Sequence, residues 1–201
     1  MDVTSIILAG GKNLRLGRNK ALEAINGERL IERVIHRLEP LSERILIVTS
    51  AEQIDFPFPD GVEVVTDLKP HLGPLVGIYS GMLASSSPYI IAVACDMPFL
   101  NTELLRYMLE ICGDYDAVVP RLGDGKVEPL HAVYSRNCID EIRTQLEKDM
   151  LKVYMLLKLI DVRYIDPDES RKIDPDLLSY FNINDQSDLD RAVAIAKNEK
   201  K

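Results

Sequence analysis

Short apolar runs recur along the chain, and most are apolar at every position instead of at alternate ones. Runs of this kind are typical of strands covered on both faces, as in a parallel sheet between two layers of helices. They predict six strands, at Ser5–Ala9, Arg44–Thr49, Val62–Thr66, Tyr89–Ala94, Ala117–Pro120 and Val162–Ile165. A further strand, His131–Tyr134, is expected after a hairpin turn over Arg121–Pro129.

Helical patterns lie between these strands. The first is a 3.6-residue stripe of apolar side chains, Leu30, Ile31, Val34, Ile35 and Leu38. Further helices are predicted at Leu75–Ala84, Leu104–Ile111, Cys138–Leu146 and Leu151–Leu159, with a last one from about Ser187. Asn101 or Thr102 is the expected N-cap of the third helix.

Alternating strands and helices predict a three-layer α/β/α Rossmann-like fold with a mostly parallel central sheet. We expect residues 1–201 to form a single domain, because the chain has no long linker and no internal repeat. In such folds, ligands bind at the carboxyl ends of the strands.

Composition narrows the class of protein. The chain has 201 residues, 46% of them hydrophobic, and a net charge of −8, which argues against general binding of nucleic acid. Its three cysteines form no CxxC pair, so we expect reduced thiols instead of a disulfide framework or a zinc site. The charged start and the short apolar runs indicate neither a signal peptide nor a membrane span. We therefore expect a cytoplasmic protein that binds no membrane.

Basic residues nevertheless gather directly after the first strand, at Lys12, Arg15, Arg18 and Lys20. Gly10 and Gly11 precede them, and glycines let backbone N–H groups approach an anion closely. Arg15 can bind phosphate oxygens bidentately, while Lys20 acts as a point charge. The spacing matches neither the P-loop nor the GxGxxG motif. On the residues alone, a phosphate-binding loop and a solvated surface turn are equally good interpretations.

Two carboxylates also lie at predicted strand ends. Asp96 follows the very apolar Ile90–Ala94, where it is placed to bind Mg²⁺, a cation that takes one or two carboxylates. The alternative is a helix cap, although Asp96 lies several residues before the next predicted helix. Asp67 follows Val62–Thr66; it either contacts a ribose or supports the phosphate loop, or it is a turn residue.

Asn182 and Asn184 alternate with apolar neighbours in the segment FNIND. Period-two alternation points both amides the same way. They are either a pair of substrate-binding amides or part of an Asx turn that leads to the last helix.

Together these motifs resemble one family. The pattern LAGGx3RxGx2K at Leu8–Lys20 is similar to the loop of nucleotidyltransferases with a Rossmann-like fold. Four more motifs resemble the molybdenum cofactor guanylyltransferase (MobA-like) branch: GPLVGI at Gly73–Ile78, CDMPFL at Cys95–Leu100, EPLHAVY at Glu128–Tyr134 and FNINDQSDL at Phe181–Leu189. The resemblance extends over nearly the whole chain.

The resemblance implies an Mg²⁺-dependent transfer of GMP from GTP to the terminal phosphate of molybdenum-bound molybdopterin, with release of pyrophosphate. It implies a nucleotide site at Leu8, Ala9, Gly10, Gly11, Lys20, Ser50, Asp67 and Asp96. Ser50 stands where many members of the family have asparagine. It further implies that Arg15 and Lys20 neutralise the phosphates, that Asp96 holds Mg²⁺, and that Asn182 and Asn184 face the pterin.

Several alternatives stay open. Another nucleotidyltransferase of this fold would use CTP with molybdopterin, or would act on a sugar phosphate or phospholactate. A nucleotide-binding regulatory protein without turnover is a possibility from a different class. For the guanylyltransferase, a molybdoenzyme apo-protein or its chaperone is a plausible receiver of the labile product.

Overall fold

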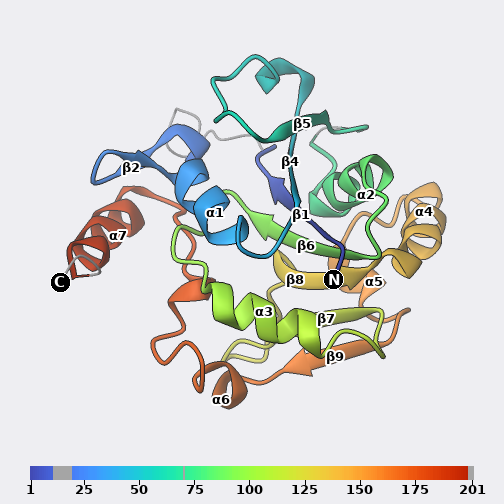
Figure 1. The fold of residues 1–201 in the computed structure, drawn as a ribbon. Coiled ribbons are helices and arrows are strands. Elements are labelled where there is room, and N and C mark those ends of the chain that lie inside the picture. The colour runs from blue at the N-terminus through green and yellow to red at the C-terminus, as the bar shows by residue number, and fades with distance from the viewer. Residues whose placement is uncertain (11–19, 70, 199–201) are drawn as a thin grey trace.

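A seven-stranded sheet in the order β5-β4-β1-β6-β8-β7-β9 runs through the computed structural model, which describes residues 1–10, 20–69 and 71–198 (Figure 1). The strands are β1 Val3–Leu8, β4 Arg44–Thr49, β5 Glu63–Thr66, β6 Tyr89–Ala94, β7 Ala117–Pro120, β8 His131–Ser135 and β9 Val162–Ile165. All seven predicted strands are present, within two residues of the expected bounds. The predicted mostly parallel sheet is confirmed, since only β8 runs antiparallel to its neighbours.

The register of the parallel strands brings their carboxyl ends to one edge. Leu8 at the end of β1 lies opposite Val48 of β4 and Ala94 of β6. On the other side of β4, Thr49 pairs with Thr66 of β5. Four strands therefore end side by side, and the loops that follow them share one edge of the sheet.

Helices cover both faces of the sheet (Figure 1). One face is covered by α1 Leu30–Leu38 and α3 Thr102–Glu110, the other by α2 Pro74–Ala84, α4 Ile139–Glu147 and α5 Val153–Leu156. Neighbouring residues of β1 point to opposite cores: Ile7 packs with α1 and α3, and Ile6 with α2. This double burial is the physical reason for the continuous apolar runs, and it confirms the three-layer prediction.

The remaining elements are short, apart from the last helix. They are 3₁₀ turns η1 Lys20–Leu22, η2 Ala51–Gln53, η3 Arg136–Cys138 and η4 Leu178–Tyr180, helix α6 Pro167–Ser170 and helix α7 Gln186–Asn198. Within the residues that the structure describes, no helix is long and apolar enough to cross a bilayer. The predicted helix Leu151–Leu159 is too long, because the chain leaves α5 through tight turns, with Leu159 donating to the Leu156 carbonyl, on its way to β9.

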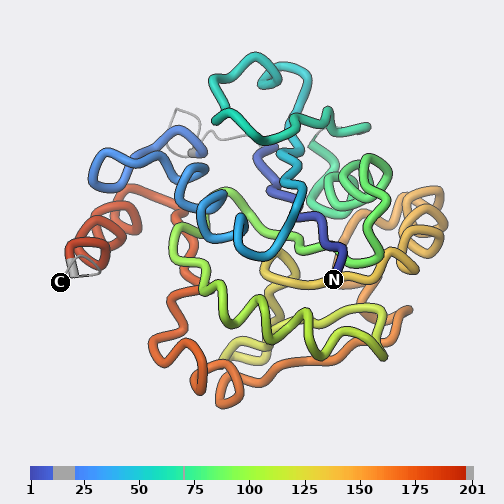
Figure 2. The backbone as a smooth tube through the Cα atoms, viewed as in Figure 1, coloured from blue at the N-terminus to red at the C-terminus, as the bar shows by residue number. Residues whose placement is uncertain are grey.

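A small hairpin, β2 Ala24–Ile25 and β3 Glu28–Arg29, is absent from the predicted elements. Asn26 and Gly27 at its tip both have positive φ, 53° and 88°, which is the turn that suits the twist of a two-residue hairpin. The Asn-Gly pair is therefore a signal that predicts this hairpin. The hairpin packs beside α7, as Figures 1 and 2 show, and closes a third apolar cluster with Phe99 and Ile183.

Helix α2 lies very close to β1 because its inner face carries glycine. A Cβ on Gly81 would lie 2.4 Å from Ile6 Cδ1, and one on Gly77 would lie 2.9 Å from Leu8 Cδ2. Pro74 occupies the first turn, where its missing N–H costs nothing. The close approach places the N-terminus of α2 beside the end of β1.

We predict that Gly81→Ala lowers stability, because the added methyl overpacks the interface between α2 and β1. Overpacking of this kind costs about 1–3 kcal/mol, and each kcal/mol shifts Tm by about 2–4 °C for a chain of this size. Gly113→Ala is the matched control, since nothing lies within 4 Å of a Cβ there. A G81A variant as stable as G113A in thermal unfolding would contradict the proposed close packing.

Candidate active site

A cavity of about 520 Å³ opens at the carboxyl edge of the sheet, between the ends of β1, β5 and β6 and the N-terminus of α2. Six of the residues expected at a nucleotide or substrate site line it: Leu8, Ala9, Gly10, Asp67, Asp96 and Asn182. The β1 end is fixed by sheet-like bonds, in which Ala9 donates to the Val48 carbonyl at 2.9 Å and Cys95 to the Leu8 carbonyl at 3.2 Å.

Asp96 directly follows Cys95 beyond β6 and is half-buried in the cavity wall. It does not cap α3, because Asn101 does: the Asn101 Oδ1 accepts from the backbone N–H groups of Glu103 at 3.0 Å and Leu104 at 3.1 Å. The cap interpretation of Asp96 is therefore wrong. The Asp96 carbonyl accepts from the Ile183 N–H at 3.0 Å, which ties the C-terminal segment to the end of β6.

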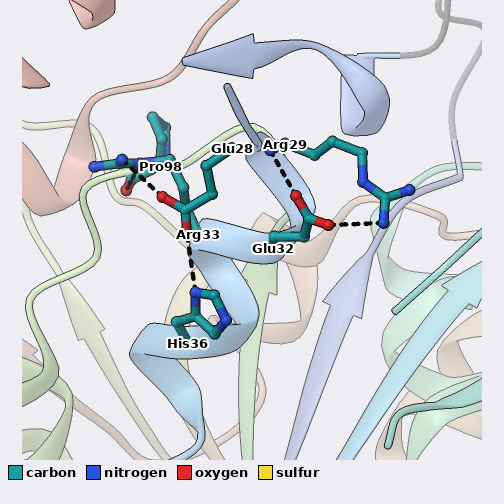
Figure 3. Close-up of polar contacts among 6 residues, drawn as sticks. All are labelled: Glu28, Arg29, Glu32, Arg33, His36 and Pro98. Atoms are coloured by element: carbon teal, nitrogen blue, oxygen red, sulfur yellow. Dashed lines mark hydrogen bonds and ion pairs between the residues drawn. The ribbon is translucent and has the colours of Figure 1, made fainter. Parts of the chain in front are cut away.

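Arg33 of α1 holds the turn that follows Asp96 (Figure 3). Arg33 donates through Nε to the Pro98 carbonyl at 3.4 Å and through Nη1 to Glu28 Oε2 at 3.1 Å. The other oxygen of Glu28 lies 2.8 Å from His36 Nδ1. This network anchors the turn that carries Asp96 on a rigid helix.

Asp67 is held by α2. Its Oδ1 accepts from the Lys69 N–H at 3.3 Å and lies 3.3 Å from the Ser80 hydroxyl, whose one proton it shares with the nearer Val76 carbonyl at 2.8 Å. Ser80 Oγ accepts from the Leu68 N–H at 3.1 Å. Burial raises the pKa of Asp67, and these hydrogen bonds and the nearby His71 offset the rise in part. The carboxylate is thus fixed in the cavity wall, where burial makes its ionised form less stable than it is in water.

Glu128, which stands before β8, also lines the cavity, although the residue patterns did not single it out. Its Oε1 accepts from the Leu130 N–H at 3.2 Å, and the nearby Asn182 side chain acts to lower the pKa of its carboxyl group. Burial raises the pKa of Glu128, and the charge of Asp96 raises it further. The signal that could have found it is an acidic residue at the start of the mostly apolar EPLHAVY segment.

A network of buried hydrogen bonds holds in position the segment that leads to Asn182. His131 Nε2 lies 2.6 Å from Ser179 Oγ, which also accepts from the Asn101 N–H at 2.8 Å, while the Ser179 N–H donates to Asp174 at 2.8 Å. Complete burial lowers the pKa of His131 to about 4, so its imidazole is neutral at physiological pH. Asn182 then donates to the Tyr180 carbonyl at 3.3 Å.

The structure places other expected site residues elsewhere. Ser50 is buried at the start of η2, outside the cavity wall. Asn184 is exposed and its N–H donates to Asp188 at 2.9 Å, so of the two amides only Asn182 reaches the cavity. Gly11 and Arg15 lie outside the described residues, as does the side chain of Lys20.

The described wall of the cavity is acidic. It contains the carboxylates of Asp67, Asp96 and Glu128 and one imidazole, that of His71. In the sequence, the basic segment Lys12–Lys20 begins two residues after Gly10, which lines the wall. An anionic ligand in this cavity therefore depends on cations from that segment or on a metal ion.

The chain is similar to known proteins over its whole length. Residues 5–162 match the family described as MobA-like NTP transferase domain. A probable molybdenum cofactor guanylyltransferase from Pelotomaculum thermopropionicum is 36% identical over 200 residues, which cover 100% of this chain and 96% of that protein. A molybdenum cofactor guanylyltransferase from Desulfosudis oleivorans is 36% identical over 197 residues, covering 97% and 96%.

Among solved structures, molybdopterin-guanine dinucleotide biosynthesis protein A from Archaeoglobus fulgidus superposes with a TM-score of 0.82. It is 29% identical to this chain, and the match covers 97% of this chain and 99% of that one. The similarity therefore includes the C-terminal segment with Asn182 as well as the first loop.

We predict that Glu128→Gln stabilises the protein at pH 7.5. Because the pKa of Glu128 is raised on folding, its ionisation disfavours the folded state as the pH rises above the usual range of a carboxyl group, about 4.3. Gln cannot ionise, and its side-chain oxygen can still accept from the Leu130 N–H. The Tm of E128Q should therefore exceed that of wild type at pH 7.5, by about 2–4 °C for each kcal/mol relieved.

The gain should shrink toward pH 4, where most of the wild-type carboxyl is protonated in both states. Glu43→Gln, at an exposed position, is the matched control and should show no comparable pH-dependent gain. An E128Q difference that stays constant from pH 4 to 7.5 would show that ionisation of Glu128 is not its cause.

Proposed function

The chain belongs to the MobA-like NTP transferase family, and on that basis we propose that it transfers GMP from GTP to the terminal phosphate of molybdenum-bound molybdopterin. The products are the guanine dinucleotide cofactor and pyrophosphate. One structural observation supports the proposal independently of membership of the family. A single cavity joins the backbone at Leu8–Gly10, Asp67 and Asp96 with Asn182 of the distant C-terminal segment.

The reaction joins two phosphates and needs positioning more than acid–base chemistry. An oxygen of the pterin phosphate attacks the α-phosphorus of GTP, and the bond from that phosphorus to the β-phosphate oxygen breaks. The attacking phosphate is already ionised at neutral pH, so the chain need not supply a general base. Asp67, held by Ser80, faces the nucleotide, and Asn182, held by the Tyr180 carbonyl, faces the acceptor.

We assign charge neutralisation to the basic loop. Arg15 and Lys20 would bind the triphosphate and the departing pyrophosphate, since cations favour the charge that develops on the leaving group. Acidic side chains dominate the described wall of the cavity, so these two residues would supply the positive charge that a triphosphate requires.

The carboxylates of the cavity suit a magnesium ion. Asp96 and Glu128 are close enough for the charge of one to raise the pKa of the other, and a divalent cation between such groups relieves their repulsion. Asp96 would hold the ion. When bound, Mg²⁺ neutralises charge on the phosphates of the nucleotide.

The proposal also includes the compartment of the reaction and the protein that receives its product. The three cysteines are all free, which agrees with a reducing compartment, and we place the protein in the cytoplasm. The acceptor of the finished cofactor would be a molybdoenzyme apo-protein or its chaperone, because the product is labile.

Base selection is tested by titrating the protein with GTP, CTP, ATP and UTP in the presence of Mg²⁺, using calorimetry. We expect GTP to bind most tightly. CTP is the second candidate, because Ser50 replaces the longer amide of many relatives and is buried outside the cavity wall. Tighter binding of CTP would make the protein a cytidylyltransferase of the same fold, and equal binding of all four would rule out base selection at this site.

We predict that Asp96→Asn abolishes Mg²⁺-dependent turnover while the protein stays folded. Loss of the charged metal ligand should reduce kcat by at least about 100-fold, the scale seen when one electrostatic contact to a transition state is removed. Asp190→Asn on the exposed face of α7 is the matched control and should keep wild-type activity. Turnover of D96N close to the wild-type rate would show that Asp96 does not hold the metal.

A further inference from the structure

His71 has a backbone conformation that disfavours a side chain. Its φ is 68°, in the left-handed region that suits glycine. Three other non-glycine residues of the described chain share this feature: Asn26, Asp149 and Leu177. Asn26 forms a hairpin tip, and the backbone N–H groups of Asp149 and Leu177 close turns onto Leu146 and Asp174. His71 also lies in a turn, but it is the one of these four residues that lines the active-site cavity.

The contacts of the His71 side chain do little to offset this strain. Its Nε2 lies 3.8 Å from Glu52 Oε2, which is longer than a hydrogen bond, and the Glu52 side chain is 80% exposed. An exposed pair at this distance adds little stability. The folded protein would therefore lose little by having glycine here, and residues held in strained conformations cluster where function requires them.

The position of His71 indicates which part of a ligand it meets. It lines the cavity together with Asp67, Gly73 and Pro74, on the side of β5 and α2. Asp96 and Glu128 line it beyond β6, on the other side of β1. If the phosphates lie near Asp96, as the proposed function requires, the nucleoside extends toward His71.

We infer that His71 contacts the guanine base of the bound nucleotide and determines nucleotide affinity; this inference rests on the proposed function. An imidazole ring offers a flat face on which a base stacks. In a different orientation, the one N–H of a neutral imidazole can instead donate in the plane of the base to O6 or N7, which are both acceptors in guanine. The loop after β5 therefore keeps His71 in the cavity wall, next in the wall to Asp67 and Gly73, despite its strained backbone.

The test compares His71→Gly with wild type in two measurements, calorimetric binding of GTP with Mg²⁺ and thermal unfolding. Glycine relieves the strain, so Tm should rise by about 2–4 °C. Removal of the ring should weaken GTP binding by about tenfold, the scale of one lost base–aromatic stack. A higher Tm combined with a weaker affinity is a pattern that a structural residue would not give. In steady-state assays, KM for GTP should rise while KM for the pterin substrate stays the same.

Asp149→Gly is the matched control, because it places glycine at another exposed position of positive φ, outside the cavity wall. It should leave GTP binding unchanged. His71→Asn provides a second test, since Asn tolerates this backbone conformation but lacks the ring, and it should bind GTP as weakly as H71G.

H71G that binds GTP as tightly as wild type, or that has a lower Tm than wild type, would overturn the inference while leaving the proposed function intact. Weaker GTP binding by D149G would overturn the inference as well, because the loss of affinity would then not be specific to the His71 side chain. Failure of wild type to bind any nucleoside triphosphate would instead remove the proposed function, and the inference with it.

Discussion

The parallel pairing of β1 with both β4 and β6 is the constraint on which the site depends. Leu8, Val48 and Ala94 lie in one register, so the chain leaves three strands at the same edge of the sheet. Parallel strands need crossover connections, and here those connections are the helices that bury both faces. The cavity therefore lies where the backbone must leave the sheet, and the groups that follow each strand are brought together without any direct attraction between them.

Close packing converts this arrangement into a defined polar site. Because Gly77 and Gly81 let α2 approach β1, Ser80 on the same helix reaches Asp67 after β5. On the opposite face, Arg33 of α1 holds the turn after Asp96. Each carboxylate is thus positioned by a helix from a different layer. A change in helix packing would therefore displace the carboxylates of Asp67 and Asp96 as well as the side chains of the core.

The site carries a free-energy cost that the rest of the fold must offset. Burial raises the pKa of both Asp67 and Glu128, and His71 adds a strained backbone at the same cavity. A ligand that brings cations would relieve the repulsion between the carboxylates. This relief of an unfavourable interaction in the unliganded protein would make the binding free energy more favourable. Stability and function are expected to oppose each other at these three residues.

Local patterns in the sequence determined the elements of the fold. Continuous apolar runs predicted six strands of the main sheet, since strands buried on both faces have no polar side, and a hairpin turn predicted the seventh, β8. Asn101 was an expected cap of α3. The errors were local too: the helix after α4 is shorter than its apolar run, and the hairpin at Asn26-Gly27 carried a turn signal without long strands. Asp67 and Asp96 could be proposed one at a time, because each lies within two residues of the end of a strand.

Only the tertiary structure decided which of these side chains meet. Asn182 reaches the cavity and Asn184 does not, because the Ile183 N–H bonds to the Asp96 carbonyl and the chain then turns into α7. Glu128 and Asn182 line the same cavity although they are far apart in the sequence, and no periodicity links the two. Sequence patterns report the burial and direction of each segment by itself, whereas contacts between distant segments depend on strand order and helix packing, which arise only when the whole chain folds.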